Sequence, residues 1–184
     1  MKRIMRFDKE DTILIAIDFQ EKLMPAVYDR EKVEKQAAKL VRGMDVLGIP
    51  IIATTQYKKG LGETVATVGD ALGQHKTFDK VTFSAYQDES FRKALEETGR
   101  KTVVLIGAEA HICVQQTALD LMETGYNVAL AADCVSSREL RSIEVALDFM
   151  GNAGIIITTG ESILFELLGS AIAPEFKEIS RIVK

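Results

Sequence analysis

Short apolar runs alternate with longer amphipathic segments along most of this chain. The short runs are rich in isoleucine, valine and threonine, whereas the longer segments repeat their apolar residues at helical spacing. Strands that alternate with helices in this way are typical of a parallel sheet covered on both faces. The pattern predicts an α/β protein with a three-layer, doubly wound (Rossmann-like) fold and a mostly parallel five- or six-stranded sheet. We expect strands at Thr12–Ile17, Ile49–Thr54, Thr102–Gly107, Asn127–Ala132 and Gly154–Thr159, and a weaker one near Thr77–Phe78.

Glycine follows most of the amphipathic segments within a residue or two. Glycine commonly ends a helix because it accepts the left-handed conformation. The last segment, Pro174–Val183, has one apolar face, which we expect to pack on the rest of the domain; a subunit contact is the alternative. We expect helices at Glu31–Leu47, Glu89–Thr98, Ile112–Glu123, Arg138–Met150, Ser162–Leu168 and Pro174–Val183, and an irregular loop at 58–62 that is either a lid or an ordinary surface loop.

The composition narrows the class of protein. With 184 residues, of which 47% are hydrophobic and 27% charged, the chain fits one globular domain spanning residues 1–184. Its formal net charge is −4 and its basic residues are mixed with acids, so it lacks the positive field that attracts nucleic acid. No apolar segment has the length of a signal peptide or a membrane span. We therefore expect a cytoplasmic protein with no nucleic-acid or membrane partner.

Cysteine and histidine are scarce. Cys113 and Cys134 are the only cysteines, too few for a disulfide framework, and we expect free thiols in a reducing compartment, although the two could pair. His75 and His111 are the only histidines, and neither belongs to a ligand-like cluster, whereas a catalytic zinc usually takes three protein ligands. We expect no metal and no cofactor.

Three chemically competent side chains lie just after expected strands. Asp18 directly follows the first strand, Lys80 follows the weak third strand, and Cys113 lies six residues past Gly107 at the expected start of a helix. Ligands of an open parallel sheet bind outside the carboxyl ends of its strands. These residues therefore define a candidate catalytic site, with Cys113 as the nucleophile and Asp18 and Lys80 as its partners.

Each of the three also has an ordinary structural explanation. An aspartate after a strand often caps a helix or forms a turn, a lysine is often solvated, and a cysteine between apolar neighbours often fills the core. Cys134 is a weaker rival as a nucleophile. Asp133 is typical of a turn and Ser136 or Ser137 of a helix N-cap, so we prefer a structural role for that segment.

The chemistry of Cys113 depends on how readily its thiol loses a proton. A free cysteine with a pKa near 8.5 is only about 3% thiolate at pH 7, whereas a pKa near 6 makes it roughly 90% thiolate. Backbone N–H groups at the helix start and the Lys80 ammonium both favour the anion, while Asp18 can take the proton and return it. We therefore expect a lowered pKa at Cys113. His111, two residues earlier, does not face Cys113 along a helix, so we expect it at the surface or lining the pocket.

Five parts of the sequence carry a family resemblance: 15–20, 55–62, Lys80 with Phe83 and Ser84, 107–114 and 174–179. Through them the chain resembles, over nearly its whole length, the isochorismatase-like cysteine hydrolases, and within them the isochorismatase domain-containing branch. That family has an Asp, Lys and Cys triad, which the resemblance places on Asp18, Lys80 and Cys113. It also implies a non-proline cis peptide bond between Ala108 and Glu109, with the N–H groups of Glu109 and Cys113 as oxyanion donors.

Two departures from related families limit the substrate. The nicotinamidases resemble this chain but bind a metal through an Asp-x-His motif and a second histidine after the second strand, and the stretch 54–57 contains neither. Isochorismatases of siderophore synthesis resemble it too, but they lack the nucleophilic cysteine. The resemblance therefore disfavours metal-bound nicotinamide and isochorismate.

These observations together predict a metal-independent cysteine hydrolase that acts on a small amide-like or related C–N substrate through a thioester. A catalytically degenerate interaction or assembly module is the alternative, and a redox-sensing thiol ranks last. Family members commonly associate, so we expect a homo-oligomer, either a dimer or a tetramer. We expect the substrate pocket to be lined by Phe19, Leu23, Gln56, Tyr57, Phe83 and His111.

Overall fold

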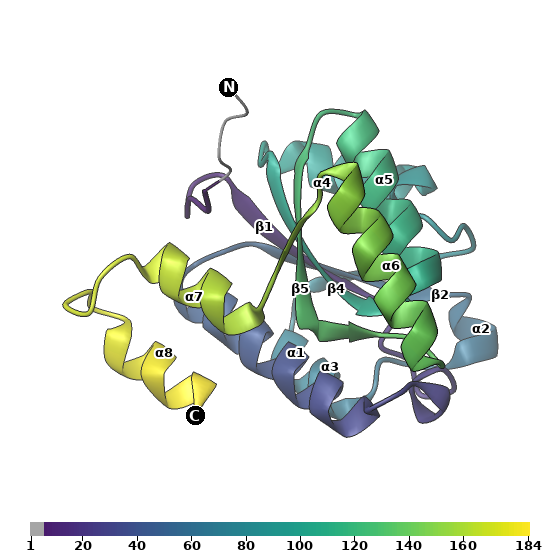
Figure 1. Cartoon of the computed structure of the whole chain (residues 1–184), viewed down its shortest axis with the longest axis horizontal. Coiled ribbons are helices and arrows are strands. Elements are labelled where there is room, and N and C mark those ends of the chain that lie inside the picture. Colours follow the sequence, from purple (N-terminus) through teal and green to yellow (C-terminus); the bar gives the residue numbers. More distant parts are fainter. Residues whose placement is uncertain (1–5) are drawn as a thin grey trace.

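A single six-stranded sheet forms the centre of the computed structural model, which describes residues 6–184. All adjacent strands run parallel, in the order β3-β2-β1-β4-β5-β6 (Figure 1). The predicted fold class is confirmed. The strands are β1 (Thr12–Ile17), β2 (Ile51–Gln56), β3 (Lys76–Lys80), β4 (Thr102–Ala108), β5 (Asn127–Ser136) and β6 (Ile156–Thr158).

Helices cover both faces of the sheet and form two outer layers (Figure 1). One layer contains α1 (Arg30–Val46), α3 (Ala66–Leu72), α7 (Gly160–Leu168) and α8 (Phe176–Val183). The opposite layer contains α4 (Glu89–Glu97), α5 (Gln115–Glu123) and α6 (Leu140–Ala153). Shorter elements are the one-turn α2 (Lys58–Leu61), the 3₁₀ turns Met24–Ala26 and Ala85–Gln87, and a π-helical turn at Ala110–Val114 that leads into α5.

The central strands appear in the sequence as uninterrupted runs of apolar residues because both of their faces are buried. In β1, Leu14 and Ala16 pack under the α1 layer, whereas Ile13, Ile15 and Ile17 pack under the α4–α6 layer. Successive side chains of a strand point to opposite faces, so a strand covered on both sides needs an apolar residue at every position. This explains why these strands could be predicted from the sequence.

Element boundaries differ from the sequence expectation where polar residues continue a strand or glycine continues a helix. Strand β5 extends through Ser136, and α6 begins only at Leu140, so the expected N-cap role of Ser136 or Ser137 is wrong. Gly151 lies inside α6, and the left-handed residue that ends this helix is Gly154. The expected loop at 58–62 contains α2, and α3 was not expected from the sequence.

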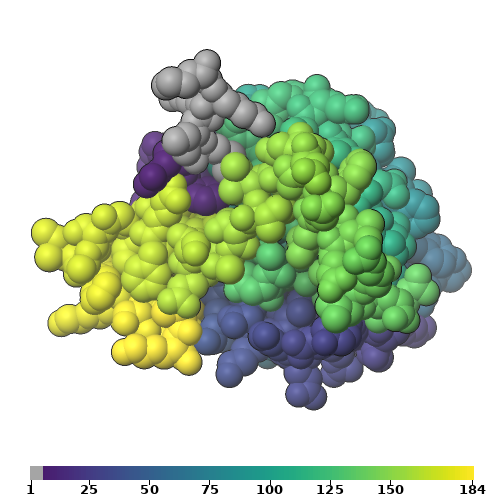
Figure 2. Space-filling view, viewed as in Figure 1, coloured from purple at the N-terminus to yellow at the C-terminus, as the bar shows by residue number. Residues whose placement is uncertain are grey.

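The C-terminal helix α8 packs on its own domain, as the preferred interpretation of its apolar face predicts. Ile179 is fully buried in the α1-side core, and Phe176 and Val183 pack against that core. The ammonium of Lys39 on α1 donates to the carbonyl of Val183 at 2.7 Å. In the space-filling view the yellow C-terminal segment lies beside the blue surface of α1 (Figure 2).

The sheet reverses its direction of growth between β1 and β4. From β1 the chain builds outward to β2 and β3, and from β4 it builds the other way to β5 and β6. The backbones approach closely here, because a Cβ atom on Gly107 would lie 2.1 Å from the carbonyl oxygen of Ile17. In open α/β sheets this reversal point is where ligands bind. Asp18 follows β1 and Cys113 lies in the turn after β4, so both stand at this point.

Candidate active site

Asp18 is a fully buried carboxylate at the carboxyl end of β1. Its backbone adopts a left-handed conformation with φ of 54°, which aspartate tolerates better than most residues. The hydroxyl of Thr54, on the neighbouring strand β2, donates to Asp18 Oδ1 at 2.8 Å, and the Asp18 N–H donates to the Thr54 carbonyl at 3.1 Å. Thr54 was not identified from the sequence, because its role depends on the pairing of Ile17 with Thr54 across the two strands.

Lys80 ends β3 and is as deeply buried as Asp18. Its Nζ lies 2.8 Å from Asp18 Oδ2 and 2.7 Å from the side-chain oxygen of Gln56. It also donates to the carbonyls of Thr82 and Phe83, at 3.2 and 3.1 Å. Breaking a buried ion pair leaves an uncompensated charge, so the two residues depend on each other for their burial.

Gln56, at the end of β2, is held in place by a second glutamine, Gln20. No role was predicted for Gln20 from the sequence. The side chain of the fully buried Gln20 accepts from the Gln56 N–H at 2.7 Å and donates to the Gln56 carbonyl at 3.2 Å. It also donates to the Gly62 carbonyl at 2.9 Å, which ties the α2 segment to the site. The end of β2 and the α2 segment are therefore fixed together.

Cys113 lies in the π-helical turn before α5, with 6% of its surface exposed. Its Sγ is 4.0 Å from the side-chain oxygen of Gln56. Burial, followed by the negative charge of Asp18, raises the pKa of the Cys113 thiol from 9.0 to about 12, against the opposing effect of Lys80. The expected lowering of this pKa is therefore wrong. The sequence indicated the ammonium and the helix start, but it did not reveal how deeply the sulfur is buried beside a carboxylate.

The turn that carries Cys113 begins at a non-proline cis peptide bond, Ala108–Glu109. The Glu109 carboxylate is nearly buried and accepts from both the backbone N–H and the Nε of Arg138, each at 3.0 Å. His111 Nδ1 lies 2.8 Å from the hydroxyl of Ser137. Consecutive residues after β5 thus hold two side chains of the turn. His111 is partly exposed, and its side chain contacts Ser137 and makes no hydrogen bond to Cys113.

Besides Gln56 and His111, four residues were expected to line a substrate pocket, and they fall into two groups. Phe19 is 2% exposed and belongs to the α1-side core, against which Leu23 also packs. Tyr57 and Phe83 are about half exposed, at 53% and 55%. Tyr57 directly follows Gln56 at the end of β2, and Phe83 lies shortly after Lys80 at the end of β3. The first group is thus accounted for by packing, and the second remains available to a ligand.

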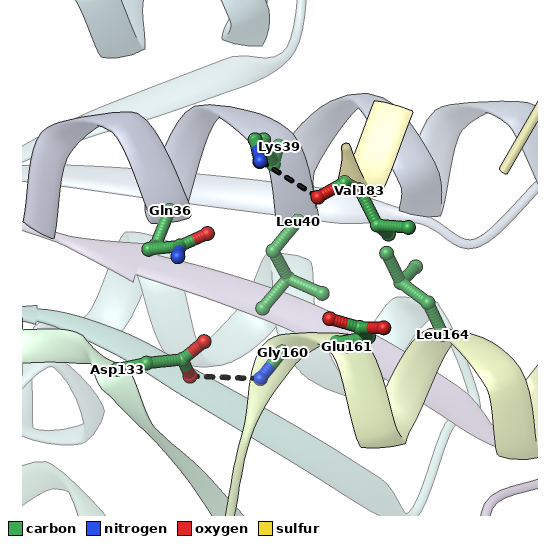
Figure 3. A pocket seen from close by; sticks show the side chains of 8 residues that line it. All are labelled: Gln36, Lys39, Leu40, Asp133, Gly160, Glu161, Leu164 and Val183. Carbon is green, nitrogen blue, oxygen red and sulfur yellow. Dashed lines mark hydrogen bonds between the residues drawn. The ribbon is translucent and has the colours of Figure 1, made fainter. Parts of the chain in front are cut away.

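Cys134 has the structural setting that was preferred for it. Its side chain is fully buried, and burial followed by the charge of Asp133 raises the pKa of its thiol. The Asp133 carboxylate accepts the first N–H of α7, from Gly160, at 2.8 Å (Figure 3). Asp133 and Gly160 border a small hollow between α1, α7 and the end of α8, and none of its lining residues belongs to the Asp18, Lys80 and Cys113 cluster.

Two further findings concern residues 6–184. No group of three or more His, Cys, Asp or Glu side chains in this range is arranged to hold a metal ion. No helix in the same range is long and apolar enough to cross a membrane.

The fold is that of a doubly wound α/β protein, with an acid, an amine and a thiol near the point where its parallel sheet reverses its direction of growth. A family model described as the isochorismatase domain matches residues 12–162. The chain belongs to this family, and its resemblance to the isochorismatase domain-containing proteins is confirmed.

Individual relatives agree with this assignment. Isochorismatase domain-containing protein 1 of Salmo salar is 42% identical over 173 residues, which are 94% of this chain and 61% of that protein. The chain thus spans less than two thirds of that relative. The MAR1 ribonuclease structure from Caenorhabditis elegans superposes with a TM-score of 0.91 at 35% identity, covering 97% of this chain and 92% of that one. The YcaC structure from Escherichia coli, described as an octameric hydrolase of unknown specificity, gives 0.88 at 25% identity, covering 93% and 86%.

Proposed function

We propose that this protein is a metal-independent cysteine hydrolase of small amide-like or related C–N substrates. The observation that carries the proposal is the buried contact of Lys80 with Asp18, at 2.8 Å, beside the thiol of Cys113. Hydrolysis of an amide needs a nucleophile, a group that moves its proton, and a positive charge near the developing anion. Cys113, Asp18 and Lys80 supply these roles in that order.

The reaction proceeds through a thioester. Asp18 takes the thiol proton of Cys113 as the sulfur forms a bond to the carbonyl carbon, and the Glu109 and Cys113 N–H groups face the carbonyl oxygen. The C–N bond then breaks, and the leaving nitrogen takes the proton from Asp18. Water attacks the thioester, gives a proton to Asp18, and the C–S bond breaks. Asp18 returns this proton to the sulfur, and a carboxylic acid leaves.

The raised pKa of Cys113 favours proton transfer during attack over a thiolate that is present beforehand. A thiol with a pKa of about 12 is ionised to only about one part in 10⁵ at pH 7. A neighbouring carboxylate that accepts the proton in the transition state removes the need for a free thiolate and contributes typically 10²- to 10⁴-fold to the rate. We assign this step to Asp18, whose charge acts on the Cys113 thiol.

A screen of small amides, ureas and carbamoyl compounds tests the proposal, with release of ammonia or an amine as the readout. We expect turnover by the purified protein and none above background by Cys113→Ser or Asp18→Asn variants that melt at a normal temperature. Turnover at the wild-type rate by either variant would contradict the assignment. No turnover of any of these compounds by the folded wild-type protein would favour the interaction or assembly module instead.

Ribonuclease activity is a second candidate, because the relative from Caenorhabditis elegans carries that description at 35% identity. The net charge of −4 and the full burial of Lys80 argue against a phosphodiester backbone at this site. Incubation with a mixed RNA substrate separates the two. Cleavage that Cys113→Ser abolishes would favour the ribonuclease.

We also propose that the protein forms a homo-oligomer, since the Escherichia coli relative is described as octameric. Light scattering of the purified chain tests this, and a monomer at micromolar concentration would contradict it. A cytoplasmic location remains part of the proposal and is tested by fractionation of the cells that make the protein.

A further inference from the structure

The ammonium of Lys80 has more acceptors than protons. An ammonium group has three N–H donors. Around Lys80 Nζ lie Gln56 Oε1 at 2.7 Å, Asp18 Oδ2 at 2.8 Å and the carbonyls of Phe83 and Thr82 at 3.1 and 3.2 Å. Four oxygen atoms therefore compete for the three protons, which leaves the sulfur of Cys113 a weak competitor for any of them. The shortest of these contacts is the one to Gln56.

The side chain of Gln56 cannot turn away easily. Its Nε2 donates to the carbonyl of Val81 at 2.9 Å, which fixes Oε1 as the atom that faces Lys80. Its backbone is held on both sides by Gln20. The same Oε1 lies 4.0 Å from Cys113 Sγ, so this oxygen stands next to both the ammonium and the thiol.

We propose that Gln56 is a positioning residue that directs an N–H of Lys80 away from Cys113 in the resting protein. A substrate that donates an N–H to Gln56 Oε1 takes over this acceptor and frees the ammonium to turn toward the sulfur. This rests on the proposed hydrolase function and narrows its substrate class to primary amides, ureas and similar compounds whose reacting group carries N–H. The arrangement keeps the thiol inactive until such a group is bound.

Two alkylating reagents, one with hydrogens and one with methyl groups on the amide nitrogen, test the idea without any turnover. 2-Iodoacetamide carries two amide N–H donors, and its N,N-dimethyl derivative carries none. Labelling of Cys113 is followed by mass spectrometry at about pH 8, each rate is divided by the rate with free cysteine, and a Cys113→Ser protein supplies the baseline. The fully buried Cys134 is distinguished by its peptide.

Two variants of nearly the same shape give opposite expectations. Gln56→Met removes the acceptor, so we expect the dimethyl reagent to label at least threefold faster than in the wild type. Gln56→Glu places a negative charge beside the thiol and strengthens the hold on Lys80, so we expect labelling at least threefold slower. Gln116→Met, at an exposed glutamine on α5, is the matched control and should label at the wild-type rate.

The wild type should prefer the primary amide reagent severalfold, and Gln56→Met should lose this preference. A preference that persists in Gln56→Met arises from the bulk of the methyl groups and would overturn the proposal. So would faster labelling of Gln56→Glu, or unchanged labelling of both variants. Because these rates concern the thiol alone, a failed search for a hydrolysed substrate leaves this test intact, and the two failures can be told apart.

Discussion

Replacing Asp18 with asparagine is expected to make the thiol of Cys113 more reactive toward alkylation and the protein less active in hydrolysis. Asparagine keeps the shape of the side chain but removes the charge that, after burial, does most to raise the pKa of Cys113. Two charges about 4 Å apart interact by about 4 kcal/mol at an effective dielectric constant near 20. Since 1.36 kcal/mol corresponds to one pH unit, this sets an upper limit of about three on the change in the pKa. Burial remains, so we expect the pKa to fall by about two, from about 12 to roughly 10.

The expected rate follows from this change. At about pH 8 the thiolate fraction rises roughly 100-fold, while the nucleophilicity of each thiolate falls with its pKa at a Brønsted slope of about 0.4 to 0.5, which leaves an increase of about tenfold. Iodoacetamide labelling of Cys113 measures it, with Asp148→Asn on the exposed face of α6 as the matched control. Hydrolysis should fall by about 10²- to 10⁴-fold in the same protein. A folded Asp18→Asn protein that labels at the wild-type rate or more slowly would refute this account of the thiol.

Further predictions concern stability. Lys80→Met should lower the free energy of unfolding in urea by about 3 to 5 kcal/mol by leaving Asp18 buried and unpaired, and adding Asp18→Asn should recover part of the loss; an unchanged midpoint for Lys80→Met would contradict the buried pair. Gly107→Ala should cost about 3 kcal/mol or more, because the new Cβ meets the Ile17 carbonyl oxygen at 2.1 Å, and a variant that melts like the wild type would refute that close approach. Because the folded protein keeps the Cys113 proton that the unfolded chain releases, the free energy of unfolding should fall by roughly 1.4 kcal/mol per pH unit from pH 9.0 to about 12. Cys113→Ala should lack this part of the pH dependence, and parallel urea midpoints for the two proteins across that range would count against the raised pKa.

The fold was predictable because its signals are local. Strands buried on both faces are continuous apolar runs, as in β1, and such runs can be read from the sequence alone. The predicted ends of helices were less accurate where more than one glycine could end the helix. Gly151 lies inside α6, and the residue with the left-handed conformation that ends this helix is Gly154, three residues later.

The site was only partly predictable. That Asp18, Lys80 and Cys113 meet follows from the rule that carboxyl ends of parallel strands share one edge. The residues that hold them, Thr54 and Gln20, act through strand register and through contacts across the sheet edge, and composition or spacing does not reveal these. The sign of the change in the Cys113 pKa was wrong for a similar reason, because the sequence identifies neighbouring charges but not the solvent that is lost around them.

The raised pKa of Cys113 also bears on oxidative chemistry. Hydrogen peroxide and disulfides react with the anionic form of sulfur, and a sensor cysteine is therefore acidic and open to solvent. Cys113 has the opposite properties in the resting protein, with 6% of its surface exposed. Such a sulfur reacts slowly with peroxide, so under the proposed function the burial that delays attack on a substrate also protects the residue from irreversible damage.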